Sequence, residues 1–356
     1  MAPVIKAIQG ADGLECQVWS TGQHRRMLDQ VLDFFGIETD VDLGVMTHDQ
    51  SLNETFGKIV AGVDQLLARR TPDLLLVHGD TTTAAAAAVA AFHRRIPIAH
   101  VEAGLRSGRM DQPWPEEFNR KLVDMVGMRL FSPTEGARQN LIAEGVPPEK
   151  ILVTGNTVVD ALLDAVERIS PGTAARGALD TQFAYLDPNK PLVLVTGHRR
   201  ENFGQGFRDI CLALRRLSQD DVQIVYPVHL NPNVLEPVKA LLGDAPDVYL
   251  IDPVDYPSFV YLMSRASVIL TDSGGVQEEA PSLGKPLLVM RNVTERPEAI
   301  EAGVAQLVGT DPGRIVASVR NALDQPARPY AINPYGDGFA SARIVQELRN
   351  VANSLR

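Results

Sequence analysis

Residues 74–91 of this 356-residue chain read LLLVHGDTTTAAAAAVAA. Four consecutive apolar residues lead into a turn that contains Gly79 and Asp80, and an alanine-rich stretch follows from Ala84. This order predicts a buried strand, a tight turn and a helix. A strand that is nearly all apolar is typical of a parallel sheet covered on both faces.

The same unit recurs along the chain. Apolar runs end near residues 101, 153, 195 and 270, and each leads into a polar turn: EAGLRSG, TGNTVVD, TGHRREN and TDSGG. One helix can be checked by its period, since its apolar residues fall on one helical face: Phe207, Cys211, Leu214 and Leu217. The chain is therefore predicted to be an α/β protein.

The strand–helix rhythm stops between about 169 and 190, where Pro, Gly, Ala and Asp are frequent. A chain of this length suits two domains of ordinary size. We therefore expect a Rossmann-like domain over 1–168, a linker over 169–190 and a second Rossmann-like domain over 191–339. A break at 334–338 precedes an amphipathic helix over 340–356, which we expect to pack back onto the first domain.

Bulk composition excludes several classes of protein. The net charge is −10, whereas a nucleic-acid-binding protein is usually basic. No apolar run reaches membrane-spanning length, and the N-terminal sequence lacks the features of a secretory signal. With only two widely separated cysteines, Cys16 and Cys211, the chain is expected to be a reduced, cytoplasmic protein without a membrane or nucleic-acid partner.

No metal or cofactor is expected. No predicted strand leads into a G-x-G-x-x-G turn, which would indicate a dinucleotide. The histidines are scattered and lack the spacing of a metal site. By default a structural role is assigned to His24, His78, His100 and His229.

Several predicted strands are followed by acidic residues. Ligands of α/β sheets bind beyond the carboxyl ends of the strands, so Asp80, Glu102 and Glu116 are expected to converge there. Such a set suits proton transfer. Asp80 could instead cap the next helix, and Glu116 and Glu117 could be first-turn acids favoured by the helix dipole. Glu102 directly follows an apolar strand, where an unpaired carboxylate costs free energy, which favours a functional role.

Two other turns suit an anion. His198–Arg200 brings three groups that can carry positive charge to a predicted helix start. Ser273–Gly275 has the composition of a phosphate cradle, although any tight turn uses glycine.

Nine segments of the chain, taken together, resemble the non-hydrolysing UDP-N-acetylglucosamine 2-epimerases of bacteria. They occur in that family's order: HGDTTT (78–83), HVEAGLRSG (100–108), PWPEEFNR (113–120), FSPTEGARQNL (131–141), TGNTVVDAL (154–162), TGHRRENFG (196–204), PVHLNPNV (227–234), LTDSGGVQEEAPSLGKP (270–286) and ERPEAIEAG (295–303). The resemblance spans nearly the whole chain. It implies two Rossmann-like domains facing a deep cleft, an architecture of the GT-B type.

The resemblance also implies roles for individual residues. The family's catalytic residues fall on Asp80, Glu102, Glu116 and His198. Its UDP contacts fall on His198, Val254, Phe259, Ser273, Gly274, Gly275, Glu279 and Arg296. The residues of possible allosteric activation by the substrate fall on Gln23, His24 and His229.

The implied activity is reversible epimerisation at C2 of UDP-N-acetylglucosamine, which gives UDP-N-acetylmannosamine. UDP would leave to give 2-acetamidoglucal and would then add back, with no cofactor, and a homodimer is the expected assembly. Four alternatives stay open: a hydrolysing 2-epimerase, a relative that acts on a UDP-linked diacetamido uronic acid, a glycosyltransferase, and an inactive UDP-sugar-binding protein.

The start of the chain departs from the family, which opens with a strand and a G-T-R-P-E-A-I-K loop. Met1–Pro3 resembles the residues that follow this loop. We therefore expect a helix in PVIKAIQG with a buried face formed by Val4, Ile5 and Ile8. We also expect a first strand near 14–18 and an interrupted sheet where the opening strand belongs.

Overall fold

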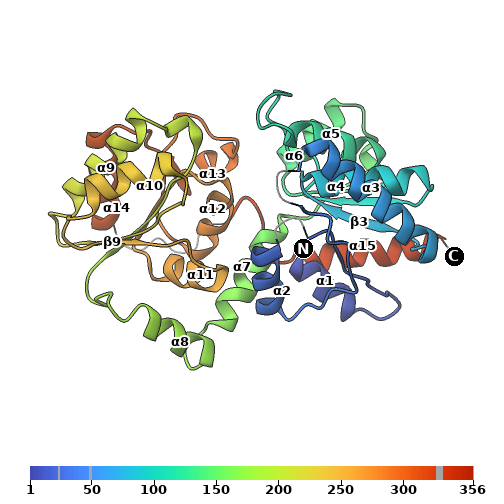
Figure 1. Cartoon of the computed structure of the whole chain (residues 1–356), viewed down its shortest axis with the longest axis horizontal. Helices are drawn as coiled ribbons and strands as arrows, with labels where there is room; N and C mark the ends of the chain where they lie inside the picture. Colours follow the sequence, from blue (N-terminus) through green and yellow to red (C-terminus); the bar gives the residue numbers. More distant parts are fainter. Residues whose placement is uncertain (23–24, 48–49, 326–331, 356) are drawn as a thin grey trace. The chain divides into compact units, whose positions relative to one another are not determined.

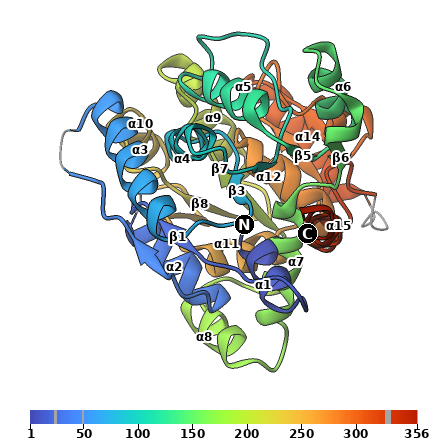
Figure 2. The same cartoon turned by 90° about the vertical axis from the view of Figure 1, so that its right-hand side faces the viewer.

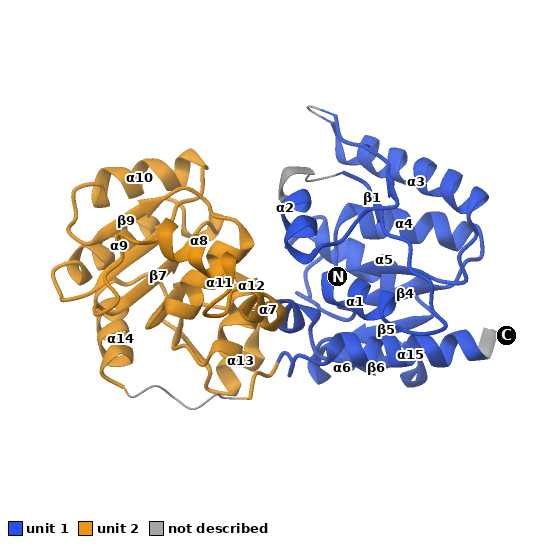
Figure 3. Ribbon diagram, turned by 90° about the horizontal axis from the view of Figure 1, so that it is seen from below, with its two compact units in different colours: residues 1–161, 335–356 blue, residues 162–334 orange. Residues whose placement is uncertain are grey.

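The computed structural model describes residues 1–22, 25–47, 50–325 and 332–355. The chain divides into two compact units (Figures 1 and 3). Unit 1 comprises Met1–Ala161 and Tyr335–Arg356, and unit 2 comprises Leu162–Pro334. Among the described residues, every strand pair in both units is parallel. The prediction of an α/β fold with parallel sheets is confirmed.

The main sheet of unit 1 has four strands in the order in which they occur along the chain. They are β3 (Leu75–His78), β4 (Ile98–Val101), β5 (Arg129–Ser132) and β6 (Ile151–Val153). The segment LLLVHGD forms β3 and the turn after it. Since β3 and β4 are parallel neighbours, the turns that follow them lie at the same edge of the sheet.

Helices cover both faces of this sheet. The helices of unit 1 in the described part of the chain are α1 (Ala2–Gln9), α2 (Arg25–Phe35), α3 (Leu52–Arg69), α4 (Thr82–His93), α5 (Glu116–Val126), α6 (Glu135–Ala143), the start of α7 (Thr157–Arg168), and α15 (Ala340–Leu355). Figure 2 shows α3 and α4 on one side of β3, with α1 and α15 on the other. Ile98 packs with α3 and α4, whereas the next residue, Ala99, packs with α1 and α15. Because successive strand residues point to opposite faces, these two helix pairs cover opposite faces. Seven alanines of α4 are buried, because their small side chains let the helix pack closely against its neighbours.

The first helix lies where the sequence predicts it, at Ala2–Gln9, with Val4 and Ile8 buried and Ile5 partly buried. The prediction of a strand at 14–18 is wrong, because β1 comprises only Trp19–Ser20. The N–H of Val18 donates to the Asp40 carboxylate at 2.7 Å instead of joining a ladder.

The strand β1 pairs with β2 (Val41–Asp42). These two strands form their own sheet, and within the described residues no ladder joins that sheet to β3–β6. The strands of unit 1 are thus divided between two sheets.

Unit 2 contains a six-stranded parallel sheet in the order β12-β11-β10-β7-β8-β9. Its strands are β7 (Leu192–Thr196), β8 (Gln223–Pro227), β9 (Val248–Ile251), β10 (Val268–Thr271), β11 (Leu287–Val289) and β12 (Ala305–Leu307). From β7 the chain builds outward to β9, and it then returns to β10 on the other side of β7. The turns after β7 and β10 therefore lie at a topological switch point, where α/β sheets bind ligands.

The helices of unit 2 are the rest of α7, α8 (Ala174–Gln182), α9 (Gln205–Leu217), α10 (Pro232–Leu242), α11 (Tyr256–Arg265), α12 (Gly274–Glu279), α13 (Pro297–Glu301) and α14 (Pro312–Asp324). The predicted apolar face of α9 is fully buried, which confirms its period. The stretch 169–190, expected as a linker, lies within unit 2 and contains α8. In the described part of the chain, every helix is too short or too polar to cross a bilayer.

Candidate active site

Three elements of unit 1 carry the predicted carboxylates. Asp80 lies in the turn after β3, Glu102 directly follows β4, and Glu116 begins α5. The first two turns are neighbours because β3 pairs with β4. A Cβ added at Gly79 would come within 3.1 Å of Glu102 Oε2, so this carboxylate lies against the turn that carries Asp80.

Glu102 has an unusual backbone conformation, with φ at 70°. A positive φ costs a residue other than glycine about 1 kcal/mol or more, and such strain concentrates at functional sites. Glu102 Oε1 accepts a hydrogen bond from Asn156 Nδ2 at 3.2 Å, and His78 Nε2 lies 3.7 Å from Oε2. Desolvation lowers the pKa of His78 well below its ordinary value.

Asp80 is not the cap of α4, so that interpretation of it is wrong. Thr81 is the cap, and its hydroxyl accepts from the N–H of Ala84 at 3.2 Å. Asp80 Oδ2 instead accepts from Arg120 Nη2 at 2.6 Å, and Asn119 Nδ2 donates to the Asp80 carbonyl at 2.8 Å. Two side chains from the first turns of α5 therefore fix both the carboxylate and the main-chain carbonyl of Asp80.

The two adjacent acids at the start of α5 differ in their surroundings. Glu117 is fully buried and accepts from the N–H groups of Ser107 and Gly108 at 3.0 and 3.3 Å. Glu116 Oε2 is also buried, but it accepts no hydrogen bond from any described residue. Buried oxygens without a partner are uncommon. Glu117 therefore anchors the 107–108 loop, whereas Glu116 keeps a buried oxygen without a described partner.

Sequence patterns did not reveal Asn119 and Arg120 as hydrogen-bond partners of Asp80. The helical spacing of Glu117 and Arg120 could have placed that pair together, and Arg120 Nη1 does donate to Glu117 at 3.2 Å. No local pattern links α5 to Asp80, which lies 40 residues away from Arg120 in sequence.

In unit 2, Asp272 organises the switch point. Its fully buried carboxylate accepts from the N–H groups of His198 and Arg199 at 3.0 and 2.9 Å, and from Asn202 Nδ2 at 3.3 Å. The turn after β10 thus holds the turn after β7, with its His198–Arg200 segment, in place. This anchoring role of Asp272 was not predicted.

His198 stays about half exposed, with Nδ1 3.6 Å from Asp272 Oδ1. Burial is the main cause that lowers its pKa, and the Asp272 carboxylate partly opposes this. The His229 ring stacks on His198 with centroids 5.8 Å apart, so a residue predicted to be allosteric lies beside a predicted catalytic one. The other predicted allosteric residues, Gln23 and His24, lie outside the described residues.

The predicted phosphate cradle lies at the start of α12, which Ser273 precedes. A Cβ added at Gly274 would lie 3.5 Å from Arg199 Nη2 and 3.9 Å from the Arg296 guanidinium. Both guanidinium groups therefore lie within ordinary van der Waals range of the Cβ position at this turn. Arg296 also forms an ion pair with the buried Glu278, which fixes its position. Paired cations over a backbone turn suit a phosphate.

The remaining predicted UDP contacts are Val254, Phe259 and Glu279, which lie near or within α11 and α12. Tyr256 Oη donates to Glu279 Oε1 at 2.9 Å and so links the start of α11 to the end of α12. Burial raises the pKa of Glu279 to about 7. Val254 precedes α11 and Phe259 lies in its first turn, and both are partly buried.

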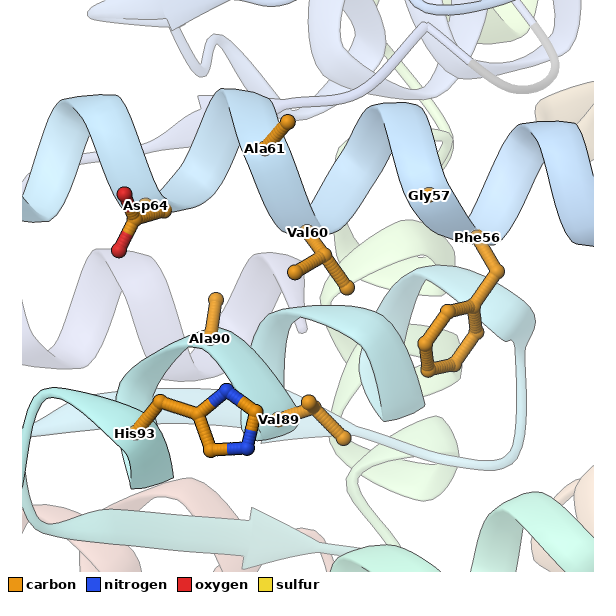
Figure 4. Close-up of a pocket in the computed structure, with 8 residues that line it drawn as sticks. All are labelled: Phe56, Gly57, Val60, Ala61, Asp64, Val89, Ala90 and His93. Carbon is orange, nitrogen blue, oxygen red and sulfur yellow. The ribbon is translucent and has the colours of Figure 1, made fainter.

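A surface hollow between α3 and α4 carries none of these groups (Figure 4). It is lined by Phe56, Gly57, Val60, Ala61, Asp64, Val89, Ala90 and His93. Its carboxylate, Asp64, is occupied by the Arg94 guanidinium. None of the predicted catalytic residues lines this hollow. Among the described residues, no cluster of His, Cys, Asp or Glu has the make-up of a metal site.

The fold and the two sets of residues define a class of protein: a two-unit parallel α/β protein with carboxylates in the turns of one unit and, in the other, a switch point whose turns carry His198 and Ser273. The sequence model of the family described as UDP-N-acetylglucosamine 2-epimerase matches residues 6–349. The chain belongs to this family, which confirms the resemblance stated above.

Relatives and solved structures agree with this assignment. The UDP-N-acetylglucosamine 2-epimerases of Salmonella typhimurium and Escherichia coli K12 are 53% and 52% identical to the chain, and each alignment covers 100% of this chain and 96% of the relative. The Neisseria meningitidis enzyme bound to UDP-GlcNAc has a TM-score of 0.90 at 44% identity, with 98% of this chain and 96% of that one covered. The Methanocaldococcus jannaschii enzyme in complex with UDP-GlcNAc and UDP has a TM-score of 0.81 at 32% identity, with 98% and 95% covered.

Proposed function

We propose that the chain interconverts UDP-N-acetylglucosamine and UDP-N-acetylmannosamine as a non-hydrolysing 2-epimerase. The observation that carries this proposal is the carboxylate set of unit 1. Asp80 and Glu102 lie in neighbouring turns, Glu116 has a buried oxygen without a described partner, and Glu102 keeps a strained backbone. Inverting a carbon requires one group to remove a proton and another to deliver one from the opposite face, which a set of carboxylates can do.

The reaction takes place in two stages. First the C2 proton passes to a base while the C1–O bond breaks, so that UDP leaves with the bonding electrons and 2-acetamidoglucal remains. UDP then re-forms the bond at C1, and C2 takes a proton on the other face. Asp80, Glu102 and Glu116 are the groups proposed for these transfers. Atoms and electrons balance over the two stages, so the reaction as written requires neither an oxidant nor a reductant.

The departing UDP requires charge stabilisation, and we assign this task to unit 2. His198, Arg296 and the Ser273–Gly275 turn are proposed to hold the diphosphate, supported by the cations over Gly274. Phe259 and the backbone of Val254 are proposed to lie by the uracil, and Glu279 is proposed to accept from the ribose hydroxyls.

Incubation of UDP-N-acetylglucosamine with the protein in deuterated water, followed by NMR, tests the proposal. We expect deuterium at C2 and new signals from intact UDP-N-acetylmannosamine. Free N-acetylmannosamine with UDP would instead identify a hydrolysing enzyme. Binding without exchange would identify an inactive UDP-sugar-binding protein, and transfer to an added acceptor a glycosyltransferase. If deuterium entered only a UDP-linked diacetamido uronic acid, that sugar and not UDP-N-acetylglucosamine would be the substrate.

We further propose that the protein is cytoplasmic and that His229 takes part in activation by the substrate. Both cysteines are free, as is usual in a reducing compartment.

We also propose that the chain forms a homodimer. Large apolar side chains are exposed on α5 and the turn before it, and a second copy would cover them: Trp114, Phe118 and Met125. Light scattering during gel filtration measures the assembly, and a monomer would contradict it.

A further inference from the structure

His100 lies on β4 and is completely buried. Its Nδ1 is 2.6 Å from Asp124 Oδ1 on α5, and its Nε2 is 2.9 Å from the carbonyl oxygen of Gly79. A carbonyl can only accept, so Nε2 carries a hydrogen and donates to Gly79. This contact reaches the turn after β3, immediately before Asp80.

Asp124 extends the link to the turn after β4. Its Oδ2 accepts from the N–H of Gly104 at 3.2 Å and lies 2.8 Å from Arg106 Nη2. Burial opposes the ionised form of Asp124, but His100 and Arg106 outweigh burial, so its pKa stays below the ordinary value. His100 therefore bridges Asp124 and Gly79 through its two ring nitrogens.

Together these two buried side chains join the three elements that carry the candidate carboxylates. Asp80 follows β3, Glu102 follows β4, and Glu116 begins α5. The N–H of Gly79 also donates to the carbonyl of Val101 at 3.0 Å. Both polar groups of Gly79 are thus tied to β4, which leaves the turn before Asp80 little freedom to shift.

We propose that His100 is a positioning residue for proton transfer at C2 of the sugar, and that it acts through its bond to Gly79. This inference rests on the proposed function. His100 touches no reacting atom in this account; it sets where Asp80 stands relative to Glu102. A displacement of a catalytic group by about 1 Å can cost about 10²-fold in rate. The UDP contacts lie in unit 2, so nucleotide binding should not depend on His100.

Two variants of His100 separate positioning from general stability. The amide nitrogen of glutamine can reach the place of Nε2 and keep the bond to Gly79, whereas that of asparagine reaches only the place of Nδ1. Both variants lose the same ring. We expect His100→Asn to lower kcat about 10²-fold and His100→Gln to recover most of this loss. Calorimetry should give both variants the UDP affinity of the unaltered protein.

A control variant lies at the other end of the same sheet. Arg129 Nη1 donates to the carbonyl of Glu149 at 2.6 Å, and the residue begins β5, away from the carboxylates. Arg129→Gln should leave kcat and UDP affinity unchanged while lowering the melting temperature. The kcat of this control shows how strongly turnover depends on stability when the link between His100 and Gly79 is intact.

The outcomes are distinct. Equal kcat for folded His100→Asn and His100→Gln would overturn the role of the Gly79 bond, whereas an unaltered protein that exchanges no deuterium at C2 would refute the proposed function itself. If neither variant folds, Asp124→Asn provides the test, because its amide keeps the shape of the carboxylate but loses the charge. Normal turnover in folded Asp124→Asn would then refute the inference.

Discussion

Glu279 should make the stability of unit 2 depend on pH, and Glu279→Gln should remove that dependence. Burial raises the pKa of this carboxyl from 4.5 to about 7. A difference of 2.5 units corresponds to about 3 kcal/mol of unfolding free energy, at 1.36 kcal/mol per unit. Glutamine cannot ionise, but its oxygen can still accept from Tyr256, so the variant isolates the charge.

The direction follows from the raised pKa. Folded Glu279 holds its proton more tightly than unfolded Glu279, so the cost of ionisation is absent below about pH 4.5 and grows as pH rises through 7. The unfolding free energy of unit 2 should therefore fall by up to about 3 kcal/mol over this window in the unaltered protein. In Glu279→Gln this fall should be absent.

The assay must report on unit 2 alone, because two-domain proteins seldom unfold in one step. Both tryptophans, Trp19 and Trp114, lie in unit 1, so their fluorescence does not report the unfolding of unit 2. Hydrogen exchange of peptides from β7 and β10, followed by mass spectrometry, reports on the correct sheet. A stability difference between Glu279→Gln and the unaltered protein that stays constant from pH 4.5 to 7 would refute the reasoning.

A control with the opposite sign is available in unit 1. Hydrogen bonds from Arg106 are the main cause that lowers the pKa of Glu144 to about 2. Its stabilising effect is present above the unfolded value of 4.5 and is lost as pH falls through 2. Glu144→Gln should thus weaken unit 1 at neutral pH, and its deficit should shrink in acid.

Three further predictions concern turnover and binding. Asp80→Asn, Glu102→Gln and Glu116→Gln should each lower kcat about 10²–10⁴-fold while UDP binding survives, and near-normal turnover would remove that residue from the mechanism. Arg296→Ala should weaken UDP binding by roughly 1.5–3 kcal/mol in calorimetry, since it deletes a charged donor; an unchanged affinity would contradict the phosphate assignment. Arg120→Ala should lower kcat, but it should have no further effect once Asp80→Asn is present; independent effects in that double-mutant cycle would show that Arg120 does not act through Asp80.

Sequence alone determined most of the local elements and the family, although it misplaced the first strand. The apolar run before HGDTTT forms β3, the predicted face of α9 is buried, and the helix at Ala2–Gln9 lies where its apolar spacing placed it. These features depend on interactions over a few residues, which periodicity and turn composition record directly. The motifs identified the family because they extend along nearly the whole chain in a fixed order.

Only the tertiary structure decided which polar side chain caps a helix, which one anchors a loop and which groups it contacts. Locally, Asp80 and Thr81 are both good caps, and Glu116 and Glu117 are both first-turn acids. Packing makes Thr81 the cap and turns Glu117 inward to the backbone of the 107–108 loop. Likewise, His100 has its partners 21 and 24 residues away, and β7 lies beside β10 across more than 70 residues. Such contacts depend on which elements meet in space, and no local pattern in a single sequence encodes that meeting.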